Sequence, residues 1–178
     1  FFYYLYCNKL IIMKNYILLL LILITSCGSP SDCNPSNGFG PVEGQKVFMG
    51  SEKTLEVFNL IDEAWAKRDY DVLKSLISDN GNYTFSDGTN VTTAEEFVDK
   101  IEESYQQSLE KGQDWGWNVD FAFSVYPKGS SDGSSPNEKG EWVNAQFTSP
   151  DGVYLEWYQI ADGQLISWFS AKNPGNTE

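Results

Sequence analysis

The sequence of 178 residues contains no histidine and few basic residues. Without an imidazole the chain cannot build a Ser-His-Asp triad, a Cys-His pair, a histidine-ligated zinc site or an imidazole proton shuttle. Only 12 lysines and arginines stand against 25 aspartates and glutamates, which gives a formal net charge of −13 at pH 7. Because nucleic-acid binding needs clustered positive charge, this composition argues against a nucleic-acid partner.

Long apolar runs are also lacking. The longest, residues 16–24, is about half of the roughly 20 residues that a membrane-spanning helix needs. Hydrophobic residues nevertheless make up 41% of the chain, and aromatic residues 15%. This content is enough for a folded domain of ordinary size.

The short apolar run has the surroundings of an export signal. Met13-Lys14-Asn15 places a positive charge before it and small residues follow it, an order typical of a secretory signal peptide. Residues 1–26 are therefore predicted to be a signal peptide of the lipoprotein type described next. An ordinary signal peptide or a buried strand is the alternative. Residues 1–12 lie ahead of a suitable start codon, so we expect translation to begin at Met13.

The end of this segment, Ile24-Thr25-Ser26-Cys27-Gly28, resembles the bacterial lipobox. The resemblance implies cleavage before Cys27 and attachment of fatty acyl chains, such as palmitate, to that cysteine. Several acyl chains anchor a protein durably, at about 0.8 kcal/mol per buried methylene. Because residue 28 is glycine and not an inner-membrane retention signal, the resemblance favours the outer membrane of a Gram-negative cell. Cys33 would then be the lone thiol of the mature chain, unable to form an internal disulfide.

The rest of the chain divides into three parts. Residues 27–50 are rich in Gly, Ser, Pro and Asn, which predicts a flexible tether. Residues 51–172 carry the regular patterns of a folded domain, and residues 173–178 are predicted to be a frayed tail.

The first half of the domain has helical patterns. Apolar residues repeat with a period of 3.6 over residues 51–67. A short second helix is expected from Asp69 or Asp71 through Ile77, with a stop at residues 79–81. Thr92 and Glu95 have the spacing of a capping box, which predicts the start of a third helix.

The second half has the alternation of strands. Residues 114–126 alternate between large and small or polar side chains, and three further apolar segments follow at 142–147, 153–160 and 165–171. A short strand at 83–85 lies between the second and third helices. Helices followed by an antiparallel meander indicate an α+β fold in which three helices pack on a strongly curved sheet.

This order of elements resembles the nuclear transport factor 2-like superfamily and its SnoaL-like branch. Points of likeness are Ala64-Trp65 near the end of the first helix, the segments 83–88 and 93–97, and the closing hairpin 162–166. The family fold is a cone in which a curved sheet partly encloses a cavity capped by helices. Its members include isomerases, dehydratases, cyclases and domains that only bind or associate, so the fold alone does not determine the function.

Aromatic residues are expected to line such a cavity, with a filled core as the alternative. The odd-numbered positions of residues 115–125 are taken as the inner face of their strand. The predicted ligand-binding set is Phe58, Asp62, Trp65, Phe85, Tyr105, Trp117, Phe121, Phe123, Phe147 and Trp157.

Two carboxylates are the catalytic candidates. Asp62 falls within the apolar arc of the first helix, where an unpaired carboxylate is costly. Asp87 follows the strand 83–85 and could lie at the cavity mouth. Each also has a plain structural interpretation, as a solvated helix flank for Asp62 and as a turn residue for Asp87. No cofactor motif is present, and no acidic spacing matches a metal loop.

The opposite face of the last strands is predicted to be an interface. Trp142, Tyr154, Tyr158 and Trp168 alternate with the expected inner residues, and exposed aromatic patches mark interaction surfaces. Since the superfamily often associates through this face, a homodimer is expected.

Three functions follow from these patterns. The first is a membrane-anchored domain that binds a small apolar or aromatic ligand in its cone. The second is a protein-interaction or dimerisation module with a filled core. The third is a histidine-free isomerase, lyase or hydrolase that uses Asp62 or Asp87.

Overall fold

The computed structural model describes residues 36–130 and 135–173. Its element order is β1 (Lys46–Met49), α2 (Glu52–Lys67), α3 (Tyr70–Ser75), β2 (Ile77–Thr84), β3 (Asn90–Val91), α4 (Ala94–Glu110), β4 (Asn118–Lys128), the 3₁₀ turn η2 (Pro136–Glu138), β5 (Glu141–Ser149), β6 (Gly152–Ala161) and β7 (Gln164–Asn173). The predicted lipidation at Cys27 and the signal peptide lie outside the described residues.

The helices begin where short polar side chains cap them. Ser51 caps α2 and Asp69 caps α3 through hydrogen bonds to backbone N–H groups of the first turn. At α4 the capping box is formed by Thr93 and Glu96, one residue later than the sequence predicts. Helix α2 is tied further to the sheet, because the Glu141 carboxylate accepts hydrogen bonds from Ser51 N at 2.7 Å and from Thr54 Oγ1 at 2.6 Å.

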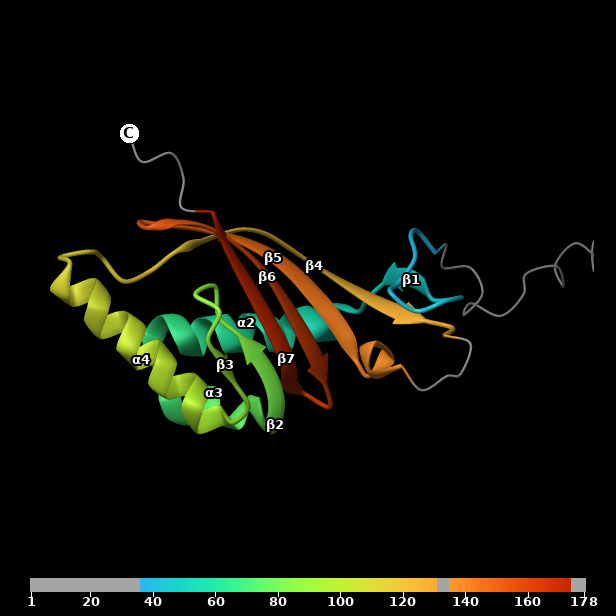
Figure 1. Cartoon of the computed structure of the whole chain (residues 1–178), viewed down its shortest axis with the longest axis horizontal. Coiled ribbons are helices and arrows are strands. Elements are labelled where there is room, and N and C mark those ends of the chain that lie inside the picture. The colour runs from blue at the N-terminus through green and yellow to red at the C-terminus, as the bar shows by residue number, and fades with distance from the viewer. Residues whose placement is uncertain (1–35, 131–134, 174–178) are drawn as a thin grey trace, which may run out of the picture. The chain divides into compact units, whose positions relative to one another are not determined.

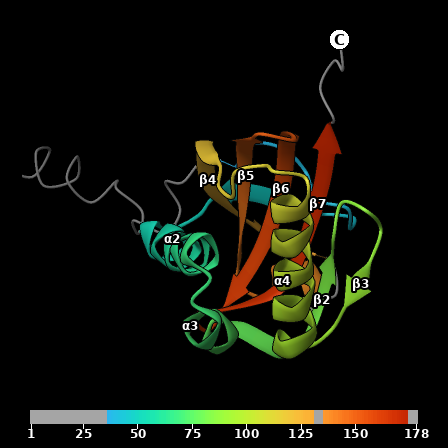
Figure 2. The same cartoon turned by 90° about the vertical axis from the view of Figure 1, so that its left-hand side faces the viewer.

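The strands form one seven-stranded sheet in the order β1-β4-β5-β6-β7-β2-β3. The meander β4-β5-β6-β7 is antiparallel, as predicted, whereas β2 pairs with β7 in parallel. Helices α2, α3 and α4 lie on one face of this curled, unclosed sheet (Figures 1 and 2). The domain therefore has the predicted α+β cone-like fold.

The core lies between this face and the helices. Phe58 and Ile61 of α2 and Phe97 of α4 are fully buried against the inner side chains of β5, β6 and β7. Burial of such side chains contributes about 1.5–3 kcal/mol each. The same inner face continues beyond the core to the cavity described below.

One local prediction is wrong. The second helix was expected to run through Ile77 and to stop at residues 79–81, but it ends at Ser75 and Ile77 opens β2. β2 carries an irregularity between Ile77 and Asn82, where the buried Tyr83 hydroxyl donates to the Ser78 carbonyl at 2.7 Å and to the Leu165 carbonyl at 2.9 Å.

The sequence also missed β1, a short edge strand within the segment assigned to the tether. Four residues are too few to show an alternation. Within residues 36–130 and 135–173, no helix has the length and apolar character needed to cross a bilayer.

Candidate functional site

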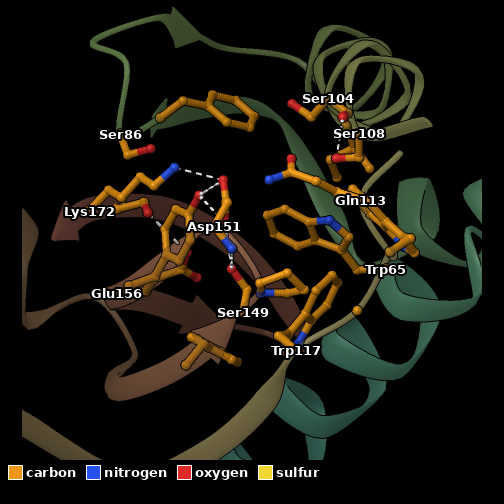
Figure 3. Close-up of a pocket in the computed structure, with 18 of the residues that line it drawn as sticks. Trp65, Ser86, Ser104, Ser108, Gln113, Trp117, Ser149, Asp151, Glu156 and Lys172 are labelled. Atoms are coloured by element: carbon orange, nitrogen blue, oxygen red, sulfur yellow. Dashed lines mark hydrogen bonds and ion pairs between the residues drawn. The ribbon is translucent and has the colours of Figure 1, made fainter. Parts of the chain in front are cut away.

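A cavity of about 310 Å³ lies between the inner sheet face and the helices. Strands β5, β6 and β7 form one wall, and α2, α4 and the segment 111–117 form the others. Figure 3 shows Glu156 and Lys172 on the sheet side and Ser104, Ser108 and Gln113 on the side of α4 and the following loop. A pocket of this size accommodates a small molecule.

The cavity walls are largely aromatic. The Trp65 ring lies 6.0 Å from that of Trp117 and 5.5 Å from that of Trp168, both in edge-to-face contacts. Phe85 packs on Trp168 at 4.8 Å. These mutual contacts fix the ring orientations before any ligand arrives. The aromatic lining is Trp65, Phe85, Trp115, Trp117, Phe147, Tyr154, Tyr158 and Trp168.

Glu156 of β6 is the buried carboxylate of this site. Its side chain is hydrogen-bonded by three neutral donors, the Tyr158 hydroxyl, the Trp168 indole N–H at 3.1 Å and the Ser170 hydroxyl at 2.9 Å. Only 7% of the residue is exposed. Burial raises the pKa of Glu156 to about 7, against the lowering effect of its three donors. The group is therefore poised to change its ionisation near neutral pH.

Asp62 of α2 is the second carboxylate on the cavity wall. Its Oδ1 accepts a hydrogen bond from Trp117 Nε1 at 2.8 Å. Partial burial raises the pKa of Asp62, and the Trp117 hydrogen bond lowers it by less. The charge of Asp62 also contributes to the raised pKa values of Glu156 and Tyr158. The two carboxylates thus share one electrostatic environment.

An ion pair lies at the rim. Lys172 Nζ is 2.6 Å from Asp151, and the Tyr154 hydroxyl donates to the same carboxylate at 3.0 Å. Lys172 and Asp151 neutralise each other (Figure 3), so this end of the cavity carries no net charge from them.

Trp115 has unused hydrogen-bonding capacity. Its indole N–H is buried and has no partner among the described residues, although its ring lines the cavity. Tyr105 supports that ring from behind at 5.4 Å, and the Arg68 guanidinium stacks on Tyr105 at 3.6 Å. A buried donor without a partner costs free energy.

Half of the predicted ligand-binding set lines the cavity, namely Asp62, Trp65, Phe85, Trp117 and Phe147. Phe58 is fully buried in the core, and Tyr105 lies behind Trp115.

The placement of Phe121, Phe123 and Trp157 on the cavity wall is wrong. All three lie on the outer face of the sheet, 39–42% exposed. A single alternation does not hold along β4, because its pairing with β5 shifts register between Val119 and Phe121 and the faces are reversed beyond the shift. Here the small residues of β4 face inward because α2 approaches closely, as the hydrogen bond from Ser124 Oγ to the Ser51 carbonyl at 3.0 Å shows.

Three of the four predicted interface residues are reversed, whereas Trp142 lies on the outer face beside Trp157, with ring centroids 6.4 Å apart. Tyr158 and Trp168 are buried, and Tyr154 lines the cavity. Trp142 is half-buried, and its indole N–H donates to the Asn137 carbonyl at 3.0 Å. An outer patch does exist, and we define it by its exposed side chains, Phe121, Phe123, Leu155, Trp157 and Phe169.

Asp87 lies outside the cavity lining. It sits in the exposed turn after β2, where it accepts from Thr89 N at 2.8 Å and pairs with Lys100 at 3.1 Å. Hydrogen bonds from Thr89, with a smaller effect of Lys100, lower the pKa of Asp87 to about 2. The plain interpretation as a turn residue is correct, and the role as a catalytic candidate is not supported by its position.

Glu156 was missed. It alternates with Tyr154 and Tyr158, so the signal was present, but these positions were assigned to the outer face. Within residues 36–130 and 135–173, no three Cys, Asp or Glu side chains converge to form a metal site.

Comparisons with solved structures identify the fold. A candidate ketosteroid isomerase from Kribbella flavida has a TM-score of 0.50 and 13% identity, over 73% of this chain and 84% of that one. A protein of unknown function with a cystatin-like fold from Nostoc punctiforme has a TM-score of 0.49 and 13% identity, over 70% and 91%. An NTF2-like protein of unknown function from Cytophaga hutchinsonii has a TM-score of 0.45 and 10% identity, over 68% and 90%.

No protein-family model matches the sequence, and a comparison with curated protein sequences finds no match. The likeness is therefore one of fold, and the domain has the nuclear transport factor 2-like fold that the sequence predicts.

Proposed function

We propose that this domain binds a small, largely aromatic or apolar molecule in its cavity. The observation that carries the proposal is the position of Glu156, a buried carboxylate on the wall of a cavity of about 310 Å³ that also carries a group of aromatic rings. Aromatic faces supply apolar contact area, and a few fixed polar groups orient the ligand.

The test is a fluorescence titration of the full chain with a panel of small neutral, cationic and anionic aromatic compounds. Several tryptophans line the cavity, so binding should change their emission. Replacing Phe147 by alanine should weaken binding by about tenfold or more, because it removes an apolar wall. Phe169→Ala, on the outer face, is the matched control. If no compound in the panel changes the emission, the cavity is not a ligand site of this kind.

A second candidate function is acid–base catalysis. A carboxyl group with a pKa near 7 can both accept and return a proton at neutral pH. In the simplest case Glu156 takes a proton from a carbon of the bound molecule and returns it to another carbon, which is an isomerisation. This replaces Asp87 by Glu156 as the partner of Asp62. Glu156→Gln would then abolish turnover while the ligand still binds; unchanged turnover would exclude this role.

We also propose that the outer patch, Phe121, Phe123, Leu155, Trp157 and Phe169, is a homodimer interface. Cross-strand pairing places Phe123, Trp157 and Phe169 in one row across β4, β6 and β7. These side chains are 39–50% exposed, and contiguous exposed aromatic residues are typical of interaction surfaces.

Finally, we propose that lipidated Cys27 anchors the chain to a membrane, in the outer membrane if the host is Gram-negative. Support comes from the segment Ile24-Thr25-Ser26-Cys27-Gly28 and from the net charge of −13. Anionic lipid repels so acidic a protein, so an acyl anchor and not the protein surface would hold it.

A further inference from the structure

We infer that the ligand of this cavity is an organic cation whose ammonium group pairs with Asp62 and Glu156. The inference rests on the proposed binding function and narrows the class of ligand. It is supported by the charges around the cavity, the neutral donors that hold each carboxylate, the aromatic walls and the negative net charge of the chain.

The cavity lining contains more acids than bases. Asp62, Asp114, Asp151 and Glu156 line it, against Lys111 and Lys172. Lys172 is paired with Asp151 at the rim. Neither Asp62 nor Glu156 takes part in any ion pair within the described part of the chain. The inner cavity therefore presents carboxylates without a protein cation.

The donors that hold these carboxylates are all neutral. Asp62 accepts from the Trp117 indole, and Glu156 accepts from Trp168, Tyr158 and Ser170. Neutral donors fix the orientation of a carboxylate but leave its charge uncompensated. A buried charge without a counter-ion is costly, and it is relieved either by protonation or by a bound cation.

The aromatic walls of the cavity also suit an organic cation. A cation is attracted to the face of an aromatic ring, and most strongly to tryptophan. Trp65 contacts both Trp117 and Trp168 edge to face, so the Trp65 ring lies in a different plane from each of the two indoles that bind the carboxylates. Each of the two carboxylates is hydrogen-bonded to one of these indoles, Asp62 to Trp117 and Glu156 to Trp168.

The net charge of the whole chain also favours a cationic ligand. A net charge of −13 attracts cations to the protein and repels anions. Aromatic acids and phosphate esters would also meet the two carboxylates inside. Of the two bases that line the cavity, Lys172 is paired with Asp151, and Lys111 lies on the loop side.

Binding should depend on pH in a defined way. Below the pKa of Glu156 a cation must displace its proton, so affinity should increase as the pH rises towards about 7. The other groups facing Glu156 are Asp62 of α2, Tyr158 on its own strand and the Lys172–Asp151 pair; Asp114 and Lys111 lie on the loop side. Burial keeps Tyr158 neutral throughout this range by raising its pKa.

The test compares two molecules of equal shape, phenyltrimethylammonium and tert-butylbenzene, by fluorescence titration of the full chain. The cation should bind about tenfold tighter or more at about pH 8, and this preference should shrink at about pH 5. Asp62→Asn should remove much of the preference. Asp87→Asn removes the same charge outside the cavity and should retain it, which separates local pairing from net charge.

Glu156→Gln is the second variant, and near-ultraviolet circular dichroism verifies its fold. If tert-butylbenzene binds as tightly as the cation, the cation inference is wrong while the proposed binding function stands. If neither molecule nor any member of the broader aromatic panel binds, the proposed function is wrong as well. A preference that Asp87→Asn and Asp62→Asn reduce equally would also overturn the inference, because it would reflect net charge alone.

Discussion

Glu156 couples the stability of the domain to pH. In the unfolded chain its pKa is near 4.5, and in the folded protein burial raises it to about 7. Between these values the folded state holds a proton that the unfolded state has lost, so the contribution of Glu156 to stability decreases as pH rises. Below about 4.5 the carboxyl is neutral in both states and this cost is absent.

We therefore expect the wild-type protein to lose stability relative to Glu156→Gln between about pH 4.5 and about pH 7. The difference should reach on the order of 3 kcal/mol, since one pKa unit corresponds to about 1.4 kcal/mol. Urea unfolding of both proteins at several pH values measures it. A difference in unfolding free energy that stays constant over this range would contradict the assignment.

Individual site residues could be predicted best where their surroundings are local. Asp62 and Trp65 were found because a helical period fixes which side of α2 faces the core. Phe121 and Phe123 were misplaced because the register shift before Phe121 reverses the faces of the strand, and a bulge of this kind leaves no mark in the alternation. Glu156 was lost because alternation along β6 does not state which of its two faces is the inner one.

Among the elements, the helix starts and the end of β2 could be read from the sequence, and the first part of β2 could not. Ser51, Asp69 and the Thr93 region cap their helices through contacts within one turn. β2 depends on its parallel pairing with β7, whose residues are far along the chain. Residues 79–81, which have the composition of a helix stop, instead form the irregular part of that strand.

Tyr83 is expected to hold this irregular part in place. Replacing Tyr83 by phenylalanine removes the hydrogen bonds to Ser78 and Leu165 and leaves buried carbonyl groups without that donor. The unfolding free energy should decrease by about 1 to 2 kcal/mol. Tyr126→Phe, in β4 near the other edge of the sheet, is the control and should change it less. Equal effects in chemical denaturation would argue against the role of the Tyr83 hydroxyl.

Glu141 links β5 to the start of α2. Its carboxylate receives hydrogen bonds from the Ser51 backbone and from the Ser51 and Thr54 hydroxyls, at the helix end where a negative charge is favoured. Glu141→Gln should destabilise the protein by about 1 kcal/mol or more, measured by thermal or urea unfolding. Glu110→Gln, exposed at the other end of the helical layer, should have little effect. A neutral result for Glu141→Gln would show that this link does not stabilise the fold.

For the assembly as a whole, the outer patch predicts a dimer. Light scattering of the wild-type protein at micromolar concentration should give twice the monomer mass. Phe123→Asp should shift the protein towards the monomer because it places a charge inside an apolar interface. Leu60→Asp, at an exposed apolar site on α2, is the control. A wild-type monomer would contradict the proposal.

The proposed anchor has a direct test in cells. Cys27→Ser should move the protein from the membrane fraction to the soluble fraction and abolish labelling with a fatty-acid analogue. Cys33→Ser should leave both unchanged. Labelling that persists without Cys27 would place the acyl chains elsewhere or exclude this type of processing.

The position of β7 sets a condition on biosynthesis. β7 is the last strand among the described residues, yet it lies between β6 and β2 in the sheet and supplies Trp168, Ser170 and Lys172 to the cavity. In a nascent chain, β2 and the strands β4, β5 and β6 cannot become parts of one sheet until the residues of β7 between them have been translated. A premature stop codon before residue 164 would thus leave β2 without its β7 partner and would also remove the part of the cavity wall that β7 supplies.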